Sequence, residues 1–494
     1  HKFDYVVIGS GIAGLNFALQ VAQKGTVAVI TKKELMESNS NYAQGGIAAV
    51  LDKHDSFKQH IEDTLKAGCY LNDKKAVETM VKEAPGAIQR LIDLGAGFNR
   101  EDNKLSLTKE GGHCARRIAH AKDATGKEIE RALIHNVRNN KNITCFESHI
   151  AIDLIVEEKK CKGVTVLNDD ADKIENFVAK AIILATGGLG QVYERNCNPK
   201  IATGDGFAMA KRIGADIKHM EFVQFHPTVL DKEDYPTFLV SETLRGEGGV
   251  LKNEEGEDFM KNYHPDKELA PRDIVSRAVT TELAKGKVYL DIRDRGKEYI
   301  KQRFPYIYDK LWWYGVKMEK DMIPVAPAAH YACGGVGTDL DGRTNIKGLY
   351  AIGEVAHTGV HGGNRLASNS LLECVVFSTR AARAVIQDKN ESLVVDKTNN
   401  YTVATSTQKQ VAKLKQTTQK IMWEDVGIIR QEDKIEEALT KLREVNKEVN
   451  SLFEKGVNRN AIELRNLVEV SIIIAEAALQ RKESACAHYI NKSN

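Results

Sequence analysis

The sequence predicts an α/β fold with three parts: a parallel-sheet domain, an α+β capping domain inserted into it, and a C-terminal helical domain. Three observations predict it. A strand–turn–helix–strand unit opens the chain, the strand–helix alternation stops between 222 and 330, and the final segments keep a helical pattern throughout. The expected limits are 1–221 with 331–386 for the sheet domain, 222–330 for the capping domain and 387–494 for the helical domain.

Composition and charge exclude several classes of protein. Hydrophobic residues make up 42% of the 494 residues, enough for a large core, and 70 Lys and Arg nearly balance 68 Asp and Glu. No overall field therefore attracts nucleic acid or an anionic membrane. No apolar stretch approaches the ~20 residues of a membrane span, and a strand is predicted near the start of the sequence, so we expect no leader. We expect a cytoplasmic protein that binds neither nucleic acid nor membrane.

The eight cysteines are scattered, and none forms a C-x-x-C pair. This spacing argues against zinc, iron–sulfur and disulfide frameworks, so we expect no metal site. Reduced, mostly buried thiols in a cytosol fit the pattern. The cysteines stand at positions 69, 114, 145, 161, 197, 333, 374 and 486.

Residues 3–30 predict one βαβ unit, with strands at 5–8 and 26–30 and a helix at 15–24. The turn between the first strand and the helix has the pattern G-x-G-x-x-G. Its first glycine allows a tight turn, its second lets the backbone approach a pyrophosphate, and its third lets the helix pack on the strand. The predicted dinucleotide turn consists of Gly9, Ser10, Gly11, Ile12, Ala13 and Gly14.

The second strand ends in Thr31 and Lys32, without the acidic residue that holds the ribose of a nicotinamide dinucleotide. Lys32 is expected to cover the adenosine or pyrophosphate part of a tightly held dinucleotide. Further glycine turns follow strands at 185–188 and 350–354, and Glu354 is placed to accept hydrogen bonds from a ribityl chain. Three such turns predict a large cofactor along the strand ends. We therefore expect a Rossmann-like FAD-binding domain rather than one for NAD.

The remaining segments follow in order. Residues 31–50 predict a loop over a ligand, and 57–95 a helical region. In the inserted segment, Trp312 and Trp313 are expected to pack between domains. A helix is predicted at 370–386, then a polar linker at 388–400 and two helices at 434–453 and 461–481.

Six more motifs occur in a fixed order. They are N-Y-A-Q-G-G-I-A-A at 41–49, F-H-P-T at 225–228, L-R-G-E-G-G at 244–249, P-R-D-I-V-S-R at 271–277, H-Y-A-C-G-G at 330–335 and H-G-G-N-R-L-A-S-N-S-L-L-E at 361–373. Over essentially the whole chain, this set resembles the flavoprotein family of succinate dehydrogenase and fumarate reductase. The resemblance is greatest to the soluble branch of that family whose members oxidise L-aspartate.

The resemblance implies how the cofactor is held. Respiratory members carry a histidine, covalently linked to FAD, five residues before the glutamine of the A-Q-G-G turn. Asn39 stands there in this chain, so FAD is expected to be bound without a covalent link. Beyond the glycine turn, the implied cofactor-binding residues are Lys32, Asn39, Ser40, Asn41, Tyr42, Ala43, Gln44, Gly45, Gly46, Asp205, Glu354, Ser370 and Leu371.

The substrate residues are implied in the same way. The segment K-E-G-G-H at 109–113 resembles the aspartate-oxidising pattern, in which the glutamate, here Glu110, faces the substrate ammonium. Such a carboxylate suits aspartate and is unhelpful for succinate, which has no amine. His226 and the Arg365–His330 pair would hold the two carboxylates, because arginine grips a carboxylate with geometry as well as charge. Ser241 is a further expected hydrogen-bonding group at the substrate.

Arg272 is the implied proton donor or acceptor at the reacting carbon, with Glu242 and Arg245 as its relay to solvent. Free arginine is a poor base, with a pKa above ~12. Arg272 must therefore be helped by neighbouring charges or act mainly in the fumarate-reducing direction. For aspartate, we expect hydride transfer to FAD to dominate.

The expected function is FAD-dependent oxidation of L-aspartate to iminoaspartate, with oxygen or fumarate as electron acceptor. By resemblance, iminoaspartate feeds quinolinate and NAD synthesis, with quinolinate synthase as the functional partner. Two alternatives stay open: a soluble fumarate reductase, and an electron-transfer subunit that works only with an iron–sulfur partner. The C-terminal R-K-E-S at 481–484 matches the family, but Ala485 and Cys486 stand where arginine and glycine normally follow. No function is assigned to that segment.

Overall fold

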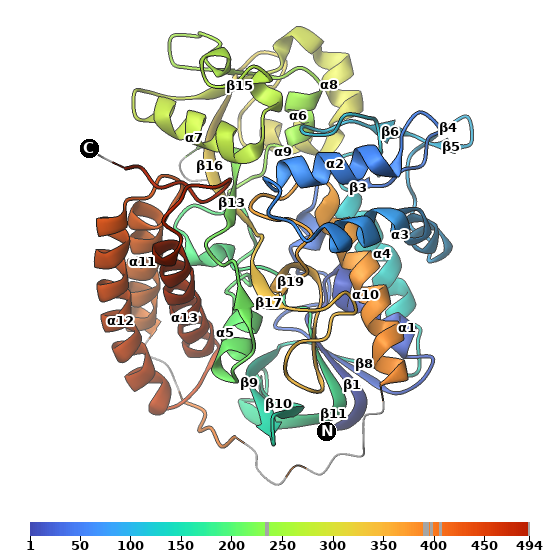
Figure 1. Ribbon diagram of the computed structural model, residues 1–494, viewed down its shortest axis with the longest axis vertical. Coiled ribbons are helices and arrows are strands. Elements are labelled where there is room, and N and C mark those ends of the chain that lie inside the picture. Colours follow the sequence, from blue (N-terminus) through green and yellow to red (C-terminus); the bar gives the residue numbers. More distant parts are fainter. Residues whose placement is uncertain (233–236, 389–394, 396–398, 405–407, 493–494) are drawn as a thin grey trace.

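A computed structural model describes residues 1–232, 237–388, 395, 399–404 and 408–492, and Figure 1 shows its three parts. The capping domain lies at one end of the long axis, and the helical domain lies along one side of the sheet domain. Most of the expected linker at 388–400 is outside the described residues. In the described part of the chain, no helix is long and apolar enough to span a membrane.

A seven-stranded sheet forms the centre of the sheet domain, in the order β8-β2-β1-β11-β10-β9, with β18 also paired to β11. The strands from β8 to β11, and β18, are parallel, which confirms the predicted parallel sheet. β10 and β9 extend it as antiparallel strands. The bounds are β1 Lys2–Ile8, β2 Val27–Ile30, β8 Ile143–Phe146, β9 His149–Glu157, β10 Lys160–Asn168, β11 Lys173–Leu184 and β18 Leu349–Ala351.

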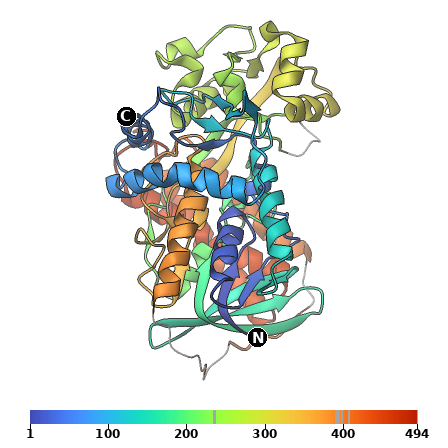
Figure 2. The ribbon, with the colours of Figure 1, turned by 90° about the vertical axis from the view of Figure 1, so that its right-hand side faces the viewer.

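Both faces of this sheet are buried, which explains the unbroken apolar runs of β1 and β2. Tyr5 and Val7 of β1 join one hydrophobic cluster, whereas Val6 and Ile8 join the other, because successive side chains of a strand point to opposite faces. Helices packed against one another, shown in Figure 2, cover the first face. They are α1 Ile12–Val21, α4 Thr125–Arg138 and α10 Asn369–Gln387. α3 Lys74–Asp93 packs against α10, and α2 Phe57–Ala67 packs against α3.

The helical domain packs toward the other face, beside α5 (Asp205–Arg212). It consists of α11 Gln408–Asp425, α12 Glu432–Glu454 and α13 Arg459–Gln480, as the helical periodicity predicted. Ion pairs attach α13 to the sheet domain: Arg212 of α5 contacts Glu469, and Lys32 after β2 contacts Glu463.

The capping domain has its own hydrophobic core around a four-stranded antiparallel sheet, β13-β16-β15-β14. The strands are β13 Val223–Leu230, β14 Val250–Lys252, β15 Tyr289–Asp291 and β16 Ile323–Ala332, and the helices are α6 Glu242–Gly246, α7 Arg272–Leu283, α8 Lys297–Arg303 and α9 Pro305–Trp313. We keep 222–330 as its proposed limits. The prediction that Trp312 and Trp313 pack between domains is wrong: at the end of α9 they are 58% and 70% exposed.

Short strands hold the loops that line the cavity described in the next subsection. β3 (Ile47–Ala48) ends the predicted ligand loop, and β6 (Leu107–Thr108) leads directly to Glu110. β3, β7 and β6 pair in one small sheet, β4 and β5 in a second, and β12, β17 and β19 in a third. The remaining bounds are β4 Arg100–Glu101, β5 Lys104–Leu105, β7 Ile118–Ala119, β12 Ile217–Lys218, β17 Gly335–Gly337 and β19 Ala356–His357.

The cysteines depart from one expectation. Six are free thiols, but Cys69, after α2, and Cys486, after α13, form a disulfide across a sequence separation of 417 residues. The expectation of reduced thiols is therefore wrong for this pair. Scattered spacing could not reveal it, because the two residues meet only when the C-terminal segment returns to the sheet domain.

Candidate active site

A cavity of about 790 Å³ runs from the glycine turn at the end of β1 to the capping domain. It is lined both by the residues expected to hold a dinucleotide and by those expected to hold a substrate. All predicted site residues line it except Gly14, Asn41 and Arg245. The cavity therefore places a large cofactor and a small polar molecule in one continuous space.

The glycine turn has the geometry that its pattern predicts. Gly9 has a φ of +114°, and a Cβ there would lie 2.1 Å from the carbonyl oxygen of Ala185. A Cβ on Gly14 would lie 2.2 Å from the oxygen of Gly9, so Gly14 packs beneath the turn instead of lining the cavity. Gly11 is the N-cap of α1 and offers no side-chain cap, which leaves the positive end of the helix dipole toward the cavity.

The wall contains polar atoms that lack a protein partner. Among the described residues, Asn39 Oδ1, Gln44 Oε1 and Thr186 Oγ1 are buried without a hydrogen bond. Buried polar atoms are normally paired, so these atoms indicate a polar ligand between the loop at 38–46 and the turn at 185–188. Asn41 has the same orphaned oxygen, but it lies behind the wall. The size of the cavity, the glycine turn and the orphaned atoms fit FAD.

Glu354 follows the third glycine turn and is buried in the wall. Its Oε1 accepts from the amide of Ala332 at 3.1 Å, and its Oε2 accepts from Asn39 Nδ2 at 3.2 Å. Burial raises the pKa of Glu354 to about 7. A Cβ on Gly188 would lie 2.3 Å from this carboxylate, so only glycine allows the close approach.

Lys32 also lines the cavity, but its ammonium already has partners. It contacts Asp205 at 2.8 Å and Glu463 at 3.1 Å, and donates to Thr203 at 2.8 Å. Burial alone would lower the pKa of Lys32, but the two carboxylates raise it above its usual range. A direct role of Lys32 or Asp205 at a dinucleotide therefore stays a proposal.

Two histidines and an arginine face the cavity near the capping domain. Arg365 Nη2 lies 2.9 Å from His330 Nε2, and the rings of His226 and His330 are 5.3 Å apart. Burial and the nearby Arg272 lower the pKa of both histidines well below the usual range, so both are neutral. The buried Nε of Arg365 has no protein partner among the described residues, which leaves a charged donor for an anion.

The tautomer of His330 follows from its neighbours. A guanidinium can only donate, so Nε2 of His330 accepts from Arg365 and the ring proton sits on Nδ1. That nitrogen lies 3.1 Å from the sulfur of Cys197, which acts as the acceptor. The thiol of Cys197 can in turn donate to the carbonyl oxygen of Ala329, 3.5 Å away. Nothing in the sequence pattern singled out Cys197.

Arg272 is the first residue of α7, so it lines the cavity from the side of the capping domain. Its Nε lies 2.5 Å from Glu242 Oε2, and Glu242 lies 3.5 Å from Arg245 Nη2. Burial alone would raise the pKa of Glu242, but Arg272 and Arg245 lower it below the usual range. Arg245 is fully buried, so a proton path to solvent must continue beyond it. Ser241 lies beside these groups as the N-cap of α6.

Glu110 is 4% exposed and lines the same cavity. Its Oε2 accepts from Ser368 Oγ at 2.5 Å, and its Oε1 accepts from Thr243 Oγ1 at 3.3 Å. Burial raises the pKa of Glu110, an effect that the hydrogen bond from Ser368 partly offsets. The cavity thus holds a desolvated acid in the same space as Arg272 and Arg365.

Sequence reasoning missed several supporting residues. Gln224 accepts from Arg272 Nη1 at 2.9 Å and donates to the main-chain oxygen of Arg365 at 2.8 Å. Its position two residues before His226 on β13 is a signal that could have found it, because alternate residues share a face. Ser368 and Thr243, which hold Glu110, come from distant segments. Ser368 stands in the motif at 361–373, but the sequence position of neither residue shows that it contacts Glu110.

Comparisons with known proteins agree with this architecture. Residues 4–371 match the FAD binding domain family, and 415–492 match the family described as fumarate reductase flavoprotein C-term. Similar solved structures include an E. coli quinol fumarate reductase (32% identity, TM-score 0.90, 100% of this chain and 91% of that one) and Mycobacterium smegmatis Sdh1 (34%, 0.85, 99% and 89%). These likenesses confirm the predicted fold class.

Curated relatives show to which branch of this family the chain is most similar. L-aspartate oxidase 2-b of Nicotiana tabacum is 44% identical over 99% of this chain and 80% of its own length. L-aspartate oxidase of Yersinia pestis is 43% identical over 99% and 96%. The chain therefore belongs to the L-aspartate oxidases, FAD-dependent oxidoreductases within the fumarate reductase and succinate dehydrogenase flavoprotein family.

Proposed function

We propose that this enzyme oxidises L-aspartate to iminoaspartate with non-covalent FAD, and passes the electrons to oxygen or fumarate. The observation that carries the proposal is Glu110, a buried carboxylate in the cavity that also holds Arg272 and Arg365. A dicarboxylate alone would be repelled by such a group, whereas an amino dicarboxylate has an ammonium for it. The proposed site thus offers a partner to each charged group of aspartate.

The residues of the site would each have one role in binding the substrate. Arg365, paired with His330, would grip one carboxylate, and neutral His226 would donate a hydrogen bond to the other. Ser241 would add a hydroxyl, and Gln224 would hold Arg272 and the Arg365 backbone in register. Bound FAD supplies the hydride acceptor. The amine proton would leave to solvent or to a nearby base.

Arg272 would serve chiefly when fumarate is the acceptor, as the proton donor to carbon. A guanidinium donates only if its proton is then replaced. Glu242, kept ionised by two arginines, would accept a proton from the solvent side and pass it on to Arg272. Because Arg272 belongs to the capping domain, closing that domain would bring the donor to the substrate and expel water. Arg245 would be the next group in this relay.

An anaerobic titration tests the function. L-aspartate is expected to bleach the flavin absorbance of the purified protein, while D-aspartate and succinate leave the flavin oxidised. Bleaching by succinate and not by L-aspartate would instead identify a fumarate reductase, an alternative that the similar solved structures fit only partly. Bleaching by L-aspartate without subsequent turnover with oxygen or fumarate would point to an electron-transfer subunit that needs an iron–sulfur partner.

Acid precipitation is expected to release all FAD into the supernatant. Asn39 occupies the position of the linking histidine. Its side-chain amide donates a hydrogen bond to Glu354, and it has no ring nitrogen that could bond covalently to the flavin. The measurement is the flavin absorbance of supernatant and pellet after trichloroacetic acid treatment, with free FAD as the recovery standard. Yellow colour retained in the washed pellet would contradict the prediction.

The cellular setting belongs to the same proposal. Iminoaspartate is an unstable product, and its use in quinolinate and NAD synthesis would make quinolinate synthase the functional partner. A cytoplasmic location is proposed as well, although several plant relatives are named as chloroplastic proteins. Transfer of the product to quinolinate synthase in a coupled assay, with quinolinate as the readout, would test the partnership.

A further inference from the structure

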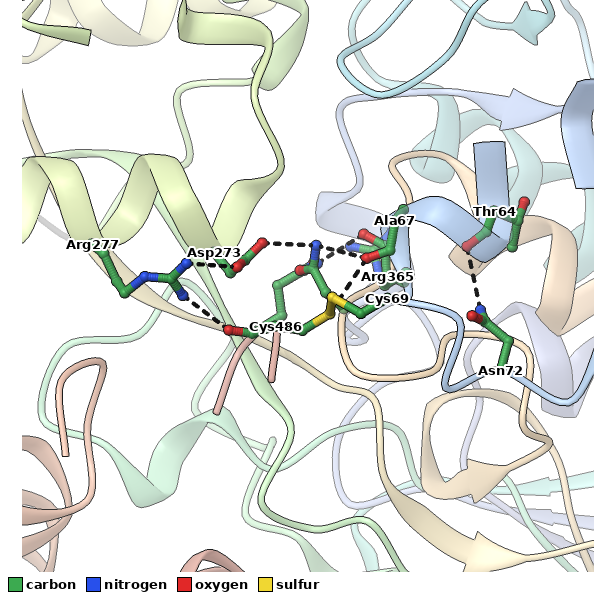
Figure 3. The surroundings of a disulfide bond; sticks show 10 residues. Thr64, Ala67, Cys69, Asn72, Asp273, Arg277, Arg365 and Cys486 are labelled. Carbon is green, nitrogen blue, oxygen red and sulfur yellow. Dashed lines mark hydrogen bonds and ion pairs between the residues drawn. A yellow bond between two sulfur atoms is a disulfide. The ribbon is translucent and has the colours of Figure 1, made fainter. Parts of the chain in front are cut away.

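The C-terminal segment at 485–487 lies where the capping domain meets the sheet domain (Figure 3). Its central residue, Cys486, is bonded to Cys69 of the sheet domain. Cys69 is exposed, whereas Cys486 is 8% exposed. Cys69 is therefore the half of the pair that a reductant or oxidant in solution would approach first.

The loop that carries Arg365 lies between the two segments that the disulfide joins. The amide of Gly363 donates to the oxygen of Gly68 at 3.1 Å, and the amide of Ala487 donates to the oxygen of Gly363 at 3.3 Å. A Cβ on Gly363 would lie 2.9 Å from that of Cys486. The main chain two residues before Arg365 is thus held between the segments of the two half-cystines.

The same segment reaches the capping domain. Arg277 of α7 donates to the main-chain oxygen of Cys486 at 2.9 Å and pairs with Asp273 at 3.0 Å (Figure 3). Asp273 in turn accepts from Asn364 at 3.2 Å, the residue before Arg365. Since α7 begins with Arg272, one covalent link connects the supports of both arginines that face the substrate space.

The backbone at both ends of the link favours release once the bond is cut. Cys69 and Cys486 have φ values of +55° and +47°, and Tyr70 next to Cys69 has +57°. Residues with a side chain adopt this left-handed region only when their surroundings hold them there. Reduction removes one of those constraints from each segment, so Gly363 and Arg277 lose a fixed partner.

We propose that Cys69 and Cys486 form a reversible thiol–disulfide site, oxidised by peroxide, that sets the affinity of the cavity for dicarboxylates. In the oxidised state, the link fixes the Arg365 loop against α7. In the reduced state, the segment at 485–487 is held only by its hydrogen bonds, and the anion grip loosens. The source of peroxide rests on the proposed function, because oxygen that accepts two electrons and two protons becomes hydrogen peroxide.

The redox steps balance. The thiolate of exposed Cys69 attacks peroxide, takes one oxygen as a sulfenic acid, and the O–O bond breaks to leave hydroxide, which becomes water. The thiol of Cys486 then attacks that sulfur, the S–O bond breaks, and a second water leaves. Two thiols thus lose two electrons and peroxide gains them. Reduction runs by attack of an external dithiol on Cys69, which expels the thiolate of Cys486.

The test uses the full FAD-loaded chain, either reduced anaerobically with dithiothreitol or treated with hydrogen peroxide, and then freed of reagent. Alkylation under denaturing conditions followed by mass measurement should find two more free thiols in the reduced form. Succinate, followed by the change in flavin absorbance, should bind about 3- to 10-fold more weakly to the reduced form. The reduced form should also melt about 3–8 °C lower. In the aspartate assay, KM should rise while kcat stays within about twofold.

Variants separate this role from general stability. Cys69→Ser and Cys486→Gly should bind succinate like the reduced form under both treatments, and glycine suits the left-handed backbone at 486. Cys145→Ser, a free and partly buried cysteine of β8, is the matched control and should keep the full redox response. Equal succinate affinity in the two redox states, or equal thiol counts, would overturn the proposal.

One further experiment distinguishes a failure of this proposal from a failure of the proposed function. During aerobic turnover of aspartate, the reduced protein should re-form the disulfide, and catalase should prevent it. Re-formation in the presence of catalase would overturn peroxide as the oxidant. Succinate binding and thiol counting need no turnover, so a redox response in a protein that fails to oxidise aspartate would reject the proposed function and retain the site for external peroxide.

Discussion

Arg272→Leu is expected to bind FAD like the wild type and to reduce fumarate at least ~10²–10³-fold more slowly, the loss typical of one well-placed charged group. Arg272 enters the cavity from the capping domain, so its removal leaves the glycine turn and the loop at 38–46 intact. It also removes the closest positive partner of Glu242, which then relies on Arg245 at 3.5 Å. The measurements are steady-state rates with each electron acceptor and the FAD content of the purified variant.

Two controls make the result interpretable. Arg293→Leu removes an exposed arginine of the same domain, paired with Asp291, and should leave both rates within about twofold. Arg272→Lys keeps the charge but loses the fork that contacts both Glu242 and Gln224, so it should recover only part of the activity. If Arg272→Leu stays within a few-fold of the wild type in aspartate oxidation and fumarate reduction alike, Arg272 has no place in the mechanism.

The fold was predictable where one local pattern has one structural solution. The glycine turn at 9–14 combines a tight turn, a close backbone approach and helix packing, and no other element needs all three. The orientation of β9 and β10 was not predictable, because alternating apolar residues are compatible with parallel and antiparallel pairing. The exposure of Trp312 and Trp313 also depends on which surface the cap turns to solvent, which their own sequence does not encode.

The sequence predicted the charged residues of the site, but not the contacts that hold these residues in place. Glu110, Arg272 and Arg365 stand in extended motifs, so the resemblance could point to them one by one. Ser368, which donates to Glu110, is 258 residues away in sequence, and only the folded chain brings the two together. The disulfide has the same character, since its partners are 417 residues apart. Long-range contacts of this kind leave no periodic signal in a single sequence.

Glu110→Gln is expected to lower kcat/KM for L-aspartate about 10- to 150-fold, because a charge-assisted hydrogen bond contributes roughly 1.5–3 kcal/mol. Glutamine keeps the shape and can still accept from Ser368, but it lacks the charge that attracts the substrate ammonium. Fumarate has no ammonium, so its reduction should change little or improve slightly. The ratio of the two activities in one preparation is the decisive measurement, since it cancels differences in folding and FAD content.

The pH dependence sharpens this test. Burial raises the pKa of Glu110, so the protonated, neutral form persists to higher pH than in an ordinary glutamate. The substrate ammonium needs the ionised form, and kcat/KM for aspartate should therefore rise as pH increases through the raised pKa, while the Glu110→Gln variant lacks that rise. Glu101→Gln, an exposed acid on β4 in the preceding segment, should leave the pH profile and both activities unchanged. Equal losses of aspartate oxidation and fumarate reduction in Glu110→Gln would instead make Glu110 a structural residue that holds Ser368 and Thr243, and the preference for aspartate would need another cause.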